Sequence, residues 1–456
     1  MNLDLVVKNG LLVIPGAGII KSALGINNGK IAGIWADDSQ VKANKVIDAQ
    51  GNYVFPGVIQ PHAHLGKLDQ LADYATETRS AAIGGVTTIM EFHRQWGDYS
   101  DNFNQRVTLA GSQAYVDFSF HFHIMSDEHL EKIPAYLKLG VASFKFIMTN
   151  KGNEPGAKGG SEYNDGLFYA ALVKLSELPG TVACIHAENH EIISYNTDKL
   201  RKIGRDDLQA WSEARPACSE SESINRALYF SAITHCPLYI VHMTCKEGLQ
   251  LVREHRRNGV SRVYAEICPQ YLTHNMHDDL GRTGKFTPPL RTKADNDALW
   301  GGLINGDIDT IGVDQVARKV DDESITIWER TNTPREAATA LPVLISEGFH
   351  KRGLPLERIA QITSANAARI FNLYPRKGTL GIGSDADFVI VDIHREKKVT
   401  KQLIQTFSEF SLYEGWTLKG WPVLTVCRGE VIMAEGEIVG KQGWGNFIAQ
   451  QTERIL

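Results

Sequence analysis

Six side chains of types that bind metal ions occur at or near the ends of apolar runs along the chain. They are His62, His64, Lys145, His186, His242 and Asp314. The runs are typical of strands, and the histidines of His62-Ala63-His64 would share one strand face because alternate residues point the same way. Imidazole and oxygen ligands without thiolate suit zinc, with manganese, cobalt or iron as alternatives. The pattern predicts a metal centre.

Each of these residues also has a purely structural explanation when it is taken alone. A single His-x-His pair is more often polar or buried without a metal, and His121 and His123 repeat the pattern. We expect packing or supporting roles for those two histidines. Lys145 could extend to the surface, and Asp314 could cap a helix. The metal-centre hypothesis depends on the coincidence of all six residue types at one rim.

The lysine requires a chemical explanation, because an ammonium group is repelled by nearby cations. Burial lowers the pKa of such a lysine further. The neutral amine can react with carbon dioxide to give a carbamate, which is an anionic ligand. A carboxylated Lys145 could bridge two cations about 3.5–4 Å apart, which would share a hydroxide and polarise a carbonyl.

Alternating apolar runs and helix-like segments must position these residues. We expect strands at 58–64, 87–93, 118–125, 143–148, 182–186, 238–242, 263–267 and 310–314, and the clearest helices at 74–83, 168–175, 224–232 and 247–255. Repeated βα units of this kind predict an α/β protein with a (β/α)8 TIM barrel, which carries its chemistry at the carboxyl ends of the strands. The alternative is a doubly wound open sheet, but no glycine-rich dinucleotide motif follows an early strand.

The two ends of the chain have a different, all-β character. Asn9-Gly10 and Asn28-Gly29 separate short apolar runs, and this dipeptide is the strongest short hairpin signal. Similar apolar runs return at 387–391, 424–427 and 431–433. We therefore expect a small β-sandwich built from residues 1–54 and 376–440, a barrel over residues 55–375, and a C-terminal tail over residues 441–456.

The composition argues against several classes of protein. The chain is 43% hydrophobic and 22% charged, as in ordinary globular domains. A net charge of -5 gives no broad attraction for nucleic acid or an anionic membrane. The cysteines form no CxxC pair, and the N-terminus resembles neither a secretion signal nor a membrane anchor. We expect a cytoplasmic protein that binds neither nucleic acid nor membrane.

Short motifs along nearly the whole chain carry a family resemblance. They include Pro56-Gly57-Val58-Ile59, Gly84-Gly85-Val86-Thr87-Thr88, His186-Ala187-Glu188-Asn189, Cys268-Pro269-Gln270-Tyr271-Leu272, Pro288-Pro289-Leu290-Arg291, Leu373-Tyr374-Pro375-Arg376-Lys377-Gly378 and Gly383-Ser384-Asp385-Ala386-Asp387. With these motifs the chain resembles the amidohydrolase superfamily, and specifically its hydantoinase and dihydropyrimidinase branch.

The resemblance implies a binuclear hydrolase that opens a ring amide or imide. At the matching positions it implies that His62 and His64 bind the first ion and that His186 and His242 bind the second. Carboxylated Lys145 would bridge the two ions, and Asp314 would bind the first ion. A bridging hydroxide would attack the ring carbonyl while Asp314 moves its proton to the leaving nitrogen. The chain would also form a homo-oligomer, a tetramer or a dimer, to which the C-terminal tail could contribute.

Several positions depart from the family pattern and predict an altered substrate pocket. Asn150 stands where a tyrosine usually donates to the developing oxyanion, and its amide is shorter. Gln315 follows Asp314 where the family usually has histidine. Thr287, where serine is common, keeps a backbone carbonyl that could hold a ring NH. With Arg94, these residues are the predicted substrate contacts.

Other activities stay open at this point. Allantoinase, dihydroorotase and cyclic imidase are the nearest enzymatic alternatives, and Arg94 and Arg318 could bind a substrate carboxylate as a dihydroorotase requires. A non-catalytic scaffold related to these enzymes is a more remote alternative. It predicts replaced metal ligands, whereas all six positions are filled here.

Overall fold

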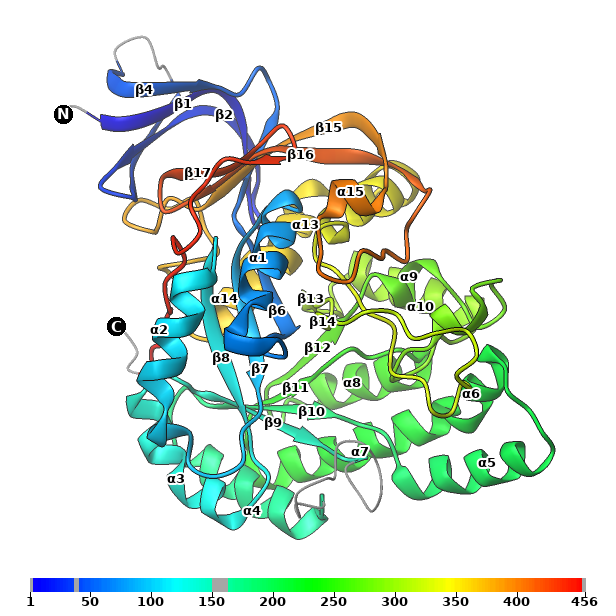
Figure 1. Ribbon diagram of the computed structural model, residues 1–456. Coiled ribbons are helices and arrows are strands. Elements are labelled where there is room, and N and C mark those ends of the chain that lie inside the picture. Colours follow the sequence, from blue (N-terminus) through cyan, green and yellow to red (C-terminus); the bar gives the residue numbers. More distant parts are fainter. Residues whose placement is uncertain (1–2, 37–40, 150–162, 453–456) are drawn as a thin grey trace.

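The computed structural model describes residues 3–36, 41–149 and 163–452. A barrel of parallel strands surrounded by helices forms the larger part, and a separate sheet made from both chain ends lies against it (Figure 1). None of the described helices is long and apolar enough to span a bilayer.

The barrel strands follow one another around the sheet in chain order. They are β6 (Val58–His64), β7 (Val86–His93), β8 (Asp117–His123), β9 (Ser143–Ile147), β10 (Val182–His186), β11 (Leu238–Ile240), β12 (Val263–Ile267), β13 (Thr310–Ile311) and β14 (Gln315–Val316). The expected strand over 310–314 is in fact two short strands on either side of Asp314. Because β13 pairs with β12 and β14 pairs with β6, the two pieces close the barrel. The predicted (β/α)8 barrel is confirmed.

Helices cover the outside of the barrel. The longer ones are α1 (Asp73–Ile83), α2 (Phe103–Gln113), α3 (Asp127–Lys138), α4 (Asp165–Ser176), α5 (His190–Lys202), α6 (Leu208–Ala214), α7 (Ala217–Thr234), α8 (Lys246–Asn258) and α10 (Lys293–Asn305). The shorter ones are α9 (Gln270–Thr273), α11 (Ala340–Val343), α12 (His350–Arg352), α13 (Leu356–Ala360), α14 (Asn366–Ile370) and α15 (Lys401–Ile404), with 3-10 turns at Asp69–Leu71, Tyr99–Asp101 and Gly281–Gly284 and π-helical turns at Leu344–Phe349 and Gln361–Ala365. The four helices expected from the sequence lie within α1, α4, α7 and α8.

The barrel strands are buried on both faces, as parallel strands beneath helices must be. Every residue of β7 and β8 is buried. Apolar side chains such as Ile59, Met90 and Tyr239 pack in one cluster with Phe371. This filled interior leaves the ends of the strands as the place for chemistry.

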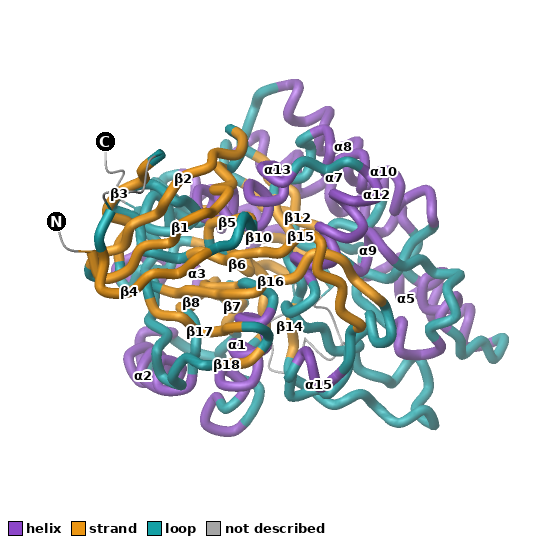
Figure 2. The backbone as a smooth tube through the Cα atoms, turned by 90° about the horizontal axis from the view of Figure 1, so that it is seen from above, coloured by secondary structure: helices purple, strands orange, loops and turns teal. Residues whose placement is uncertain are grey.

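The second sheet combines strands from both ends of the chain (Figure 2). Its strands are β1 (Leu3–Ile14), β2 (Gly18–Asn27), β3 (Lys30–Trp35), β4 (Ala43–Asp48), β5 (Tyr53–Pro56), β15 (Phe388–Lys398), β16 (Thr417–Cys427), β17 (Glu430–Ala434) and β18 (Glu437–Ile438). It encloses its own apolar core, to which Val7, Leu24, Phe388 and Val426 all contribute. The expected sandwich of both termini is confirmed.

The two Asn-Gly pairs have different outcomes. Asn28-Gly29 connects β2 to β3 with positive φ at both residues, as a tight hairpin requires. Asn9-Gly10 was wrongly predicted to be a turn, because both residues lie inside the single strand β1. There the register against β2 shifts between Val7 and Gly10, and Asn9 has a φ of 55°. A β-bulge uses the same left-handed conformation as a turn.

A buried ion cluster joins the two sheets. Lys377 is 1% exposed, and its Nζ lies 2.6 Å from Asp387 Oδ2 and 2.5 Å from Asp117 Oδ2. Arg428 adds a second cation to Asp117 at 3.1 Å. These carboxylates are therefore neutralised by side chains and have a structural role. The C-terminal tail follows the barrel, with Gln450 donating to the carbonyl of Phe120 in β8.

Candidate metal centre

The six residues predicted to bind metal converge on one end of the barrel. His62 and His64 belong to β6, Lys145 to β9 and His186 to β10, while His242 follows β11 and Asp314 lies between β13 and β14. All except His64 are at most 7% exposed. His242 and Asp314 have φ values of 37° and 58°. Such strained conformations in non-glycine residues are concentrated at functional sites.

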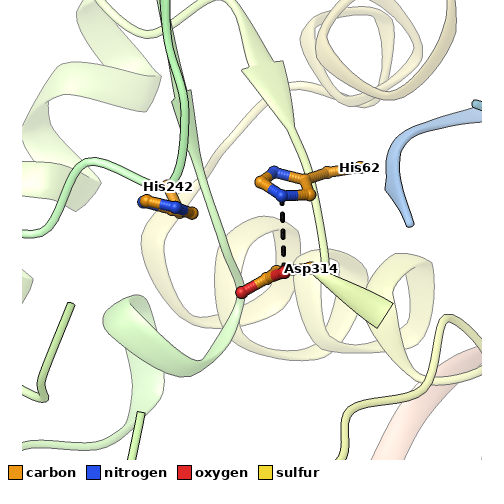
Figure 3. Close-up of side chains that lie close together, drawn as sticks. All are labelled: His62, His242 and Asp314. Atoms are coloured by element: carbon orange, nitrogen blue, oxygen red, sulfur yellow. Dashed lines mark ion pairs between the residues drawn. The ribbon is translucent and has the colours of Figure 1, made fainter. Parts of the chain in front are cut away.

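His62, His242 and Asp314 form the centre of the cluster (Figure 3). Each offers one ligand atom, and these atoms all lie within 4.8 Å of one another. Asp314 Oδ1 is 3.3 Å from His62 Nε2 and 2.9 Å from His64 Nε2. The carboxylate thus contacts both histidines of the His-x-His pair.

A second pair of ring nitrogens faces inward beside this group. His186 Nδ1 lies 3.0 Å from His242 Nε2, and the two rings are nearly perpendicular, with centroids 4.7 Å apart. The rings of His62 and His242 stack at 5.3 Å, which connects the two pairs. The four imidazoles therefore form one continuous group.

Lys145 is buried among these side chains without an ionic partner. It is 2% exposed, and its Nζ lies 4.5 Å from the ring centroid of Phe92, which itself packs on His62. No hydrogen bond or ion pair links its Nζ to a residue in the described ranges. Burial lowers the pKa of Lys145 to about 8. The lowered pKa increases the fraction of neutral amine, which is the form that can become a carbamate.

Two buried glutamates that the sequence analysis missed fix the orientation of the histidines. Glu266 Oε1 lies 2.7 Å from His62 Nδ1 and accepts from the His242 backbone N–H at 2.9 Å. Glu188 Oε2 lies 2.7 Å from His186 Nε2 and accepts from Arg215 at 2.8 Å. Although burial alone would raise it, Arg215 holds the pKa of Glu188 at about 2. Such carboxylate–histidine pairs commonly orient metal ligands.

These contacts show that the donor set fits a pair of cations. When Glu266 accepts the Nδ1 proton of His62, the Nε2 atom turns its lone pair toward the carboxylate of Asp314. His62 Nε2 has no hydrogen-bond partner among the described residues. Two acceptors 3.3 Å apart repel each other unless a cation lies between them. His186 likewise has one ring nitrogen bound to Glu188, which leaves its Nδ1 facing His242 Nε2 at 3.0 Å.

Arg335 is a further neighbour of the site for which the sequence offered no signal. Its Nη2 lies 2.6 Å from Asp314 Oδ2, and its Nε donates to the Asp314 carbonyl at 2.8 Å. Burial alone would raise the pKa of Asp314, but the Arg335 guanidinium and the adjacent imidazoles hold it well below its usual range. The carboxylate is therefore fixed in place as an anion.

The predicted substrate contacts are distributed around this centre. Thr287 is half-buried, and its hydroxyl donates to Asn332 Oδ1 at 2.9 Å. Arg94 follows β7, with its Nε 3.2 Å from the sulfur of Met125. Gln315 points away from the cluster, because its amide donates to Glu77 of α1 at 2.9 Å. Asn150 lies outside the described residues. The substrate role of all four stays a prediction.

The second His-x-His pair divides into two different environments. His121 is satisfied on both sides, with Nδ1 2.5 Å from Ser143 Oγ and Nε2 3.1 Å from the Pro61 carbonyl oxygen. His123 is 3% exposed, and its Nε2 has no partner among the described residues. Burial and the charge of Lys145 hold the pKa of His123 well below its usual value. His121 is thus a packing residue, whereas His123 keeps a free polar atom.

Comparison with known proteins places this chain in a family. The chain matches the model of the amidohydrolase family over residues 53–432. It is 32% identical to an L-hydantoinase of Paenarthrobacter aurescens, over 98% of both chains, and 32% identical to a D-hydantoinase of Geobacillus stearothermophilus, over 97% of this chain and 95% of the relative.

Solved structures agree with the sequence relatives. The L-hydantoinase (dihydropyrimidinase) from Arthrobacter aurescens superposes with a TM-score of 0.90 at 32% identity, covering 98% of this chain and all of the other. A dihydropyrimidinase from Brevibacillus agri superposes with a TM-score of 0.89 at 27% identity, covering 98% of each. From the barrel, the histidine cluster and these full-length matches, we conclude that the chain belongs to the amidohydrolase family.

Proposed function

We propose that this protein is a metal-dependent hydrolase that opens a cyclic amide or imide at a C–N bond, as its hydantoinase and dihydropyrimidinase relatives are named for doing. The observation that carries the proposal is the buried Lys145, which has no ionic partner among the described residues, beside four imidazoles and Asp314. A lysine in that position has no evident structural use, but it can become an anionic bridge.

The ligands divide into two groups in this proposal. His62 and His64 would hold one ion with Asp314, and His186 and His242 would hold the other. Carboxylated Lys145 would contribute an anionic ligand. Zinc suits these nitrogen and oxygen donors best, and manganese, cobalt or iron are alternatives. Two bound cations would supply activation of a water molecule and polarisation of the ring carbonyl.

The protein's own side chains then manage the proton. Asp314 is anionic and takes the proton of the attacking water, which it delivers to the leaving ring nitrogen. Arg335 holds the Asp314 carboxylate in position through two contacts. Glu266 and Glu188 keep the histidine lone pairs directed inward. The products are ring-opened N-carbamoyl or amide acids.

Binding of the ring would use groups outside the ligand set. The Thr287 carbonyl oxygen accepts no hydrogen bond from the described residues, so it is available for a ring NH. Arg94 lies at the same end of the barrel, beyond the end of β7. We also propose assembly into a homo-oligomer, a dimer or a tetramer, which light scattering of the purified protein would measure.

A panel of cyclic amides tests the proposed reaction. The metal-loaded protein is incubated with hydantoin, dihydrouracil, allantoin, dihydroorotate and succinimide, and the products are identified by mass spectrometry. We expect a gain of one water molecule for at least one ring, and loss of that activity after chelation. Full activity of a rigorously metal-free protein, or hydrolysis of linear amides alone, would contradict the proposal.

A further inference from the structure

Four neighbouring strands of the barrel each place a basic or imidazole group at the same rim. The strands β14, β6, β7 and β8 are adjacent in the sheet, in that order. Arg318 follows β14, Lys67 follows β6, Arg94 follows β7, and His123 ends β8. Because neighbouring strands are about 4.8 Å apart, these residues lie along one arc of the barrel mouth.

The charges on this arc act on one another. The side chain of Lys67 is exposed, but the surrounding protein removes part of its hydration and lowers its pKa. The guanidinium groups of Arg94, Arg106 and Arg318 lower this pKa further, against the opposing effect of Glu91. Lys67 comes three residues after His64 in the chain, so the basic arc borders the proposed metal centre.

The acidic groups near the arc are already occupied. Glu91 accepts from Arg106 and Tyr74, and Asp314 is bound by Arg335. In contrast, within residues 3–36, 41–149 and 163–452, no hydrogen bond or ion pair is made by the side chains of Lys67 and Arg318. Glu91 attracts Lys67, and Asp314 and Asp321 attract Arg318, but each of these two cations also lies near other cations, so the arc keeps an excess of positive charge.

Several buried polar atoms at this end of the barrel lack partners among the described residues, and two of them matter for the arc. They are Nε2 of His123 and Nη1 of Arg335, on side chains that are 3% and 6% exposed. His123 and Lys145 are neighbours, because they pair directly across β8 and β9 and both line one pocket. A buried polar atom without a partner is costly, so a ligand that supplies a partner would be stabilised here.

We propose that the ring opened by this enzyme carries a carboxylate, bound by Lys67, Arg94 and Arg318, with His123 as a further hydrogen-bonding partner. The inference rests on the proposed cyclic amide hydrolysis and specifies its substrate class. A carboxylate carries the negative charge and the acceptor oxygens that complement these cations. The residues act in binding and specificity, whereas proton transfer stays with Asp314.

A matched pair of substrates tests the charge alone. Hydantoin-5-acetate and hydantoin-5-acetamide have the same ring and nearly the same size, and only the first is an anion. We expect kcat/KM for the acid to exceed that for the amide by about 10- to 100-fold, the usual effect of hydrogen bonds to a charged group. Raising the salt concentration should reduce the preference, because the arc is partly open to solvent.

Variants of the arc then locate the preference. Lys67→Gln and Arg318→Gln should each lower the acid-to-amide ratio, whereas Arg257→Gln, which removes an exposed guanidinium from α8, should not change it. The ratio is informative even for a poorly folded or partly metal-loaded variant, because both substrates report on the same active molecules. An unchanged ratio in both arc variants would overturn the assignment of these residues.

The outcomes separate this inference from the proposed function. If the amide is opened as well as the acid, or if neither is opened while an uncharged ring of the panel is, the inference is wrong and ring hydrolysis stands. If no ring is opened by metal-loaded protein, the proposed function fails and the inference fails with it.

Discussion

Glu266 gives a sharp test of how the protein builds its metal centre. One oxygen of this fully buried carboxylate contacts His62 Nδ1 at 2.7 Å and the His242 backbone N–H at 2.9 Å. The other oxygen accepts from Tyr239 Oη at 2.8 Å. Glu266 thereby holds one ligand from each of the two proposed ion sites. Weakening it should lower the affinity for both ions without removing any ligand.

The size of the effect follows from these contacts. Glu266→Gln keeps an amide oxygen for His62 and His242 but converts charge-assisted hydrogen bonds into neutral ones, which are about half as strong. The expected loss of about 1–1.5 kcal/mol corresponds to about 10-fold in metal affinity. Glu266→Ala leaves both donors unsatisfied, so its loss should approach about 100-fold, the upper end for such supporting residues.

The assay measures bound metal directly. Each protein is stripped with a chelator, equilibrated at a series of buffered free zinc concentrations, and analysed for zinc per chain. Glu347→Gln is the matched control, because it neutralises a carboxylate paired with Lys351 on the outer helices. Binding curves for Glu266→Gln and Glu266→Ala that coincide with the wild-type curve would refute the reasoning.

Three further predictions concern single buried groups. Lys145→Ala should reduce bound metal and abolish turnover, and added formate should restore part of the activity because a small carboxylate can occupy the carbamate position; full metal content without formate would contradict this. Arg335→Met should lower the free energy of unfolding of metal-free protein in urea by about 3–5 kcal/mol, because it leaves the buried carboxylate of Asp314 without its partner. The loss should be smaller in metal-loaded protein, where a cation is the partner of Asp314. Equal losses of stability in the two forms would contradict this. Burial raises the pKa of Glu336 from 4.5 to about 7. The carboxyl group of Glu336 therefore binds its proton more tightly in the folded state than in the unfolded state. This proton's contribution to the free energy of unfolding is complete below about pH 4.5 and is lost as the pH rises through about 7. Glu336→Gln should remove this dependence, worth up to about 3 kcal/mol, and a stability difference that does not change with pH would refute it.

Most of the barrel could be predicted because its strands are apolar runs separated by periodic helices. The eighth strand was an exception, because it consists of two short strands, β13 and β14. Asp314 lies between them with a positive φ, in the turn that directs its side chain into the site. Asn9-Gly10 was the other error. A turn and a bulge make the same local demand for positive φ, and only the continuous pairing of β1 with β2 distinguishes them.

The predicted ligand residues lie close together because each lies at or just after the end of a barrel strand. The carboxyl ends of these parallel strands meet at one end of the barrel, so the position of each residue in its strand could be read from the sequence. The supporting residues were harder to see. Glu266 could have been found as an acid inside the apolar run Val263–Ile267, and Glu188 as the residue two positions after His186. Arg335 has no such signal, because its contact with Asp314 comes from a loop whose path depends on tertiary packing.

Diffraction from crystals of metal-loaded protein, recorded at the absorption edge of the bound metal, tests the central claim most directly. The account predicts two anomalous peaks, one beside His62 and His64 and one between His186 and His242, with density for a carboxyl group beyond the Nζ of Lys145. A single peak away from these histidines, or an unmodified Lys145 beside two ions, would contradict it.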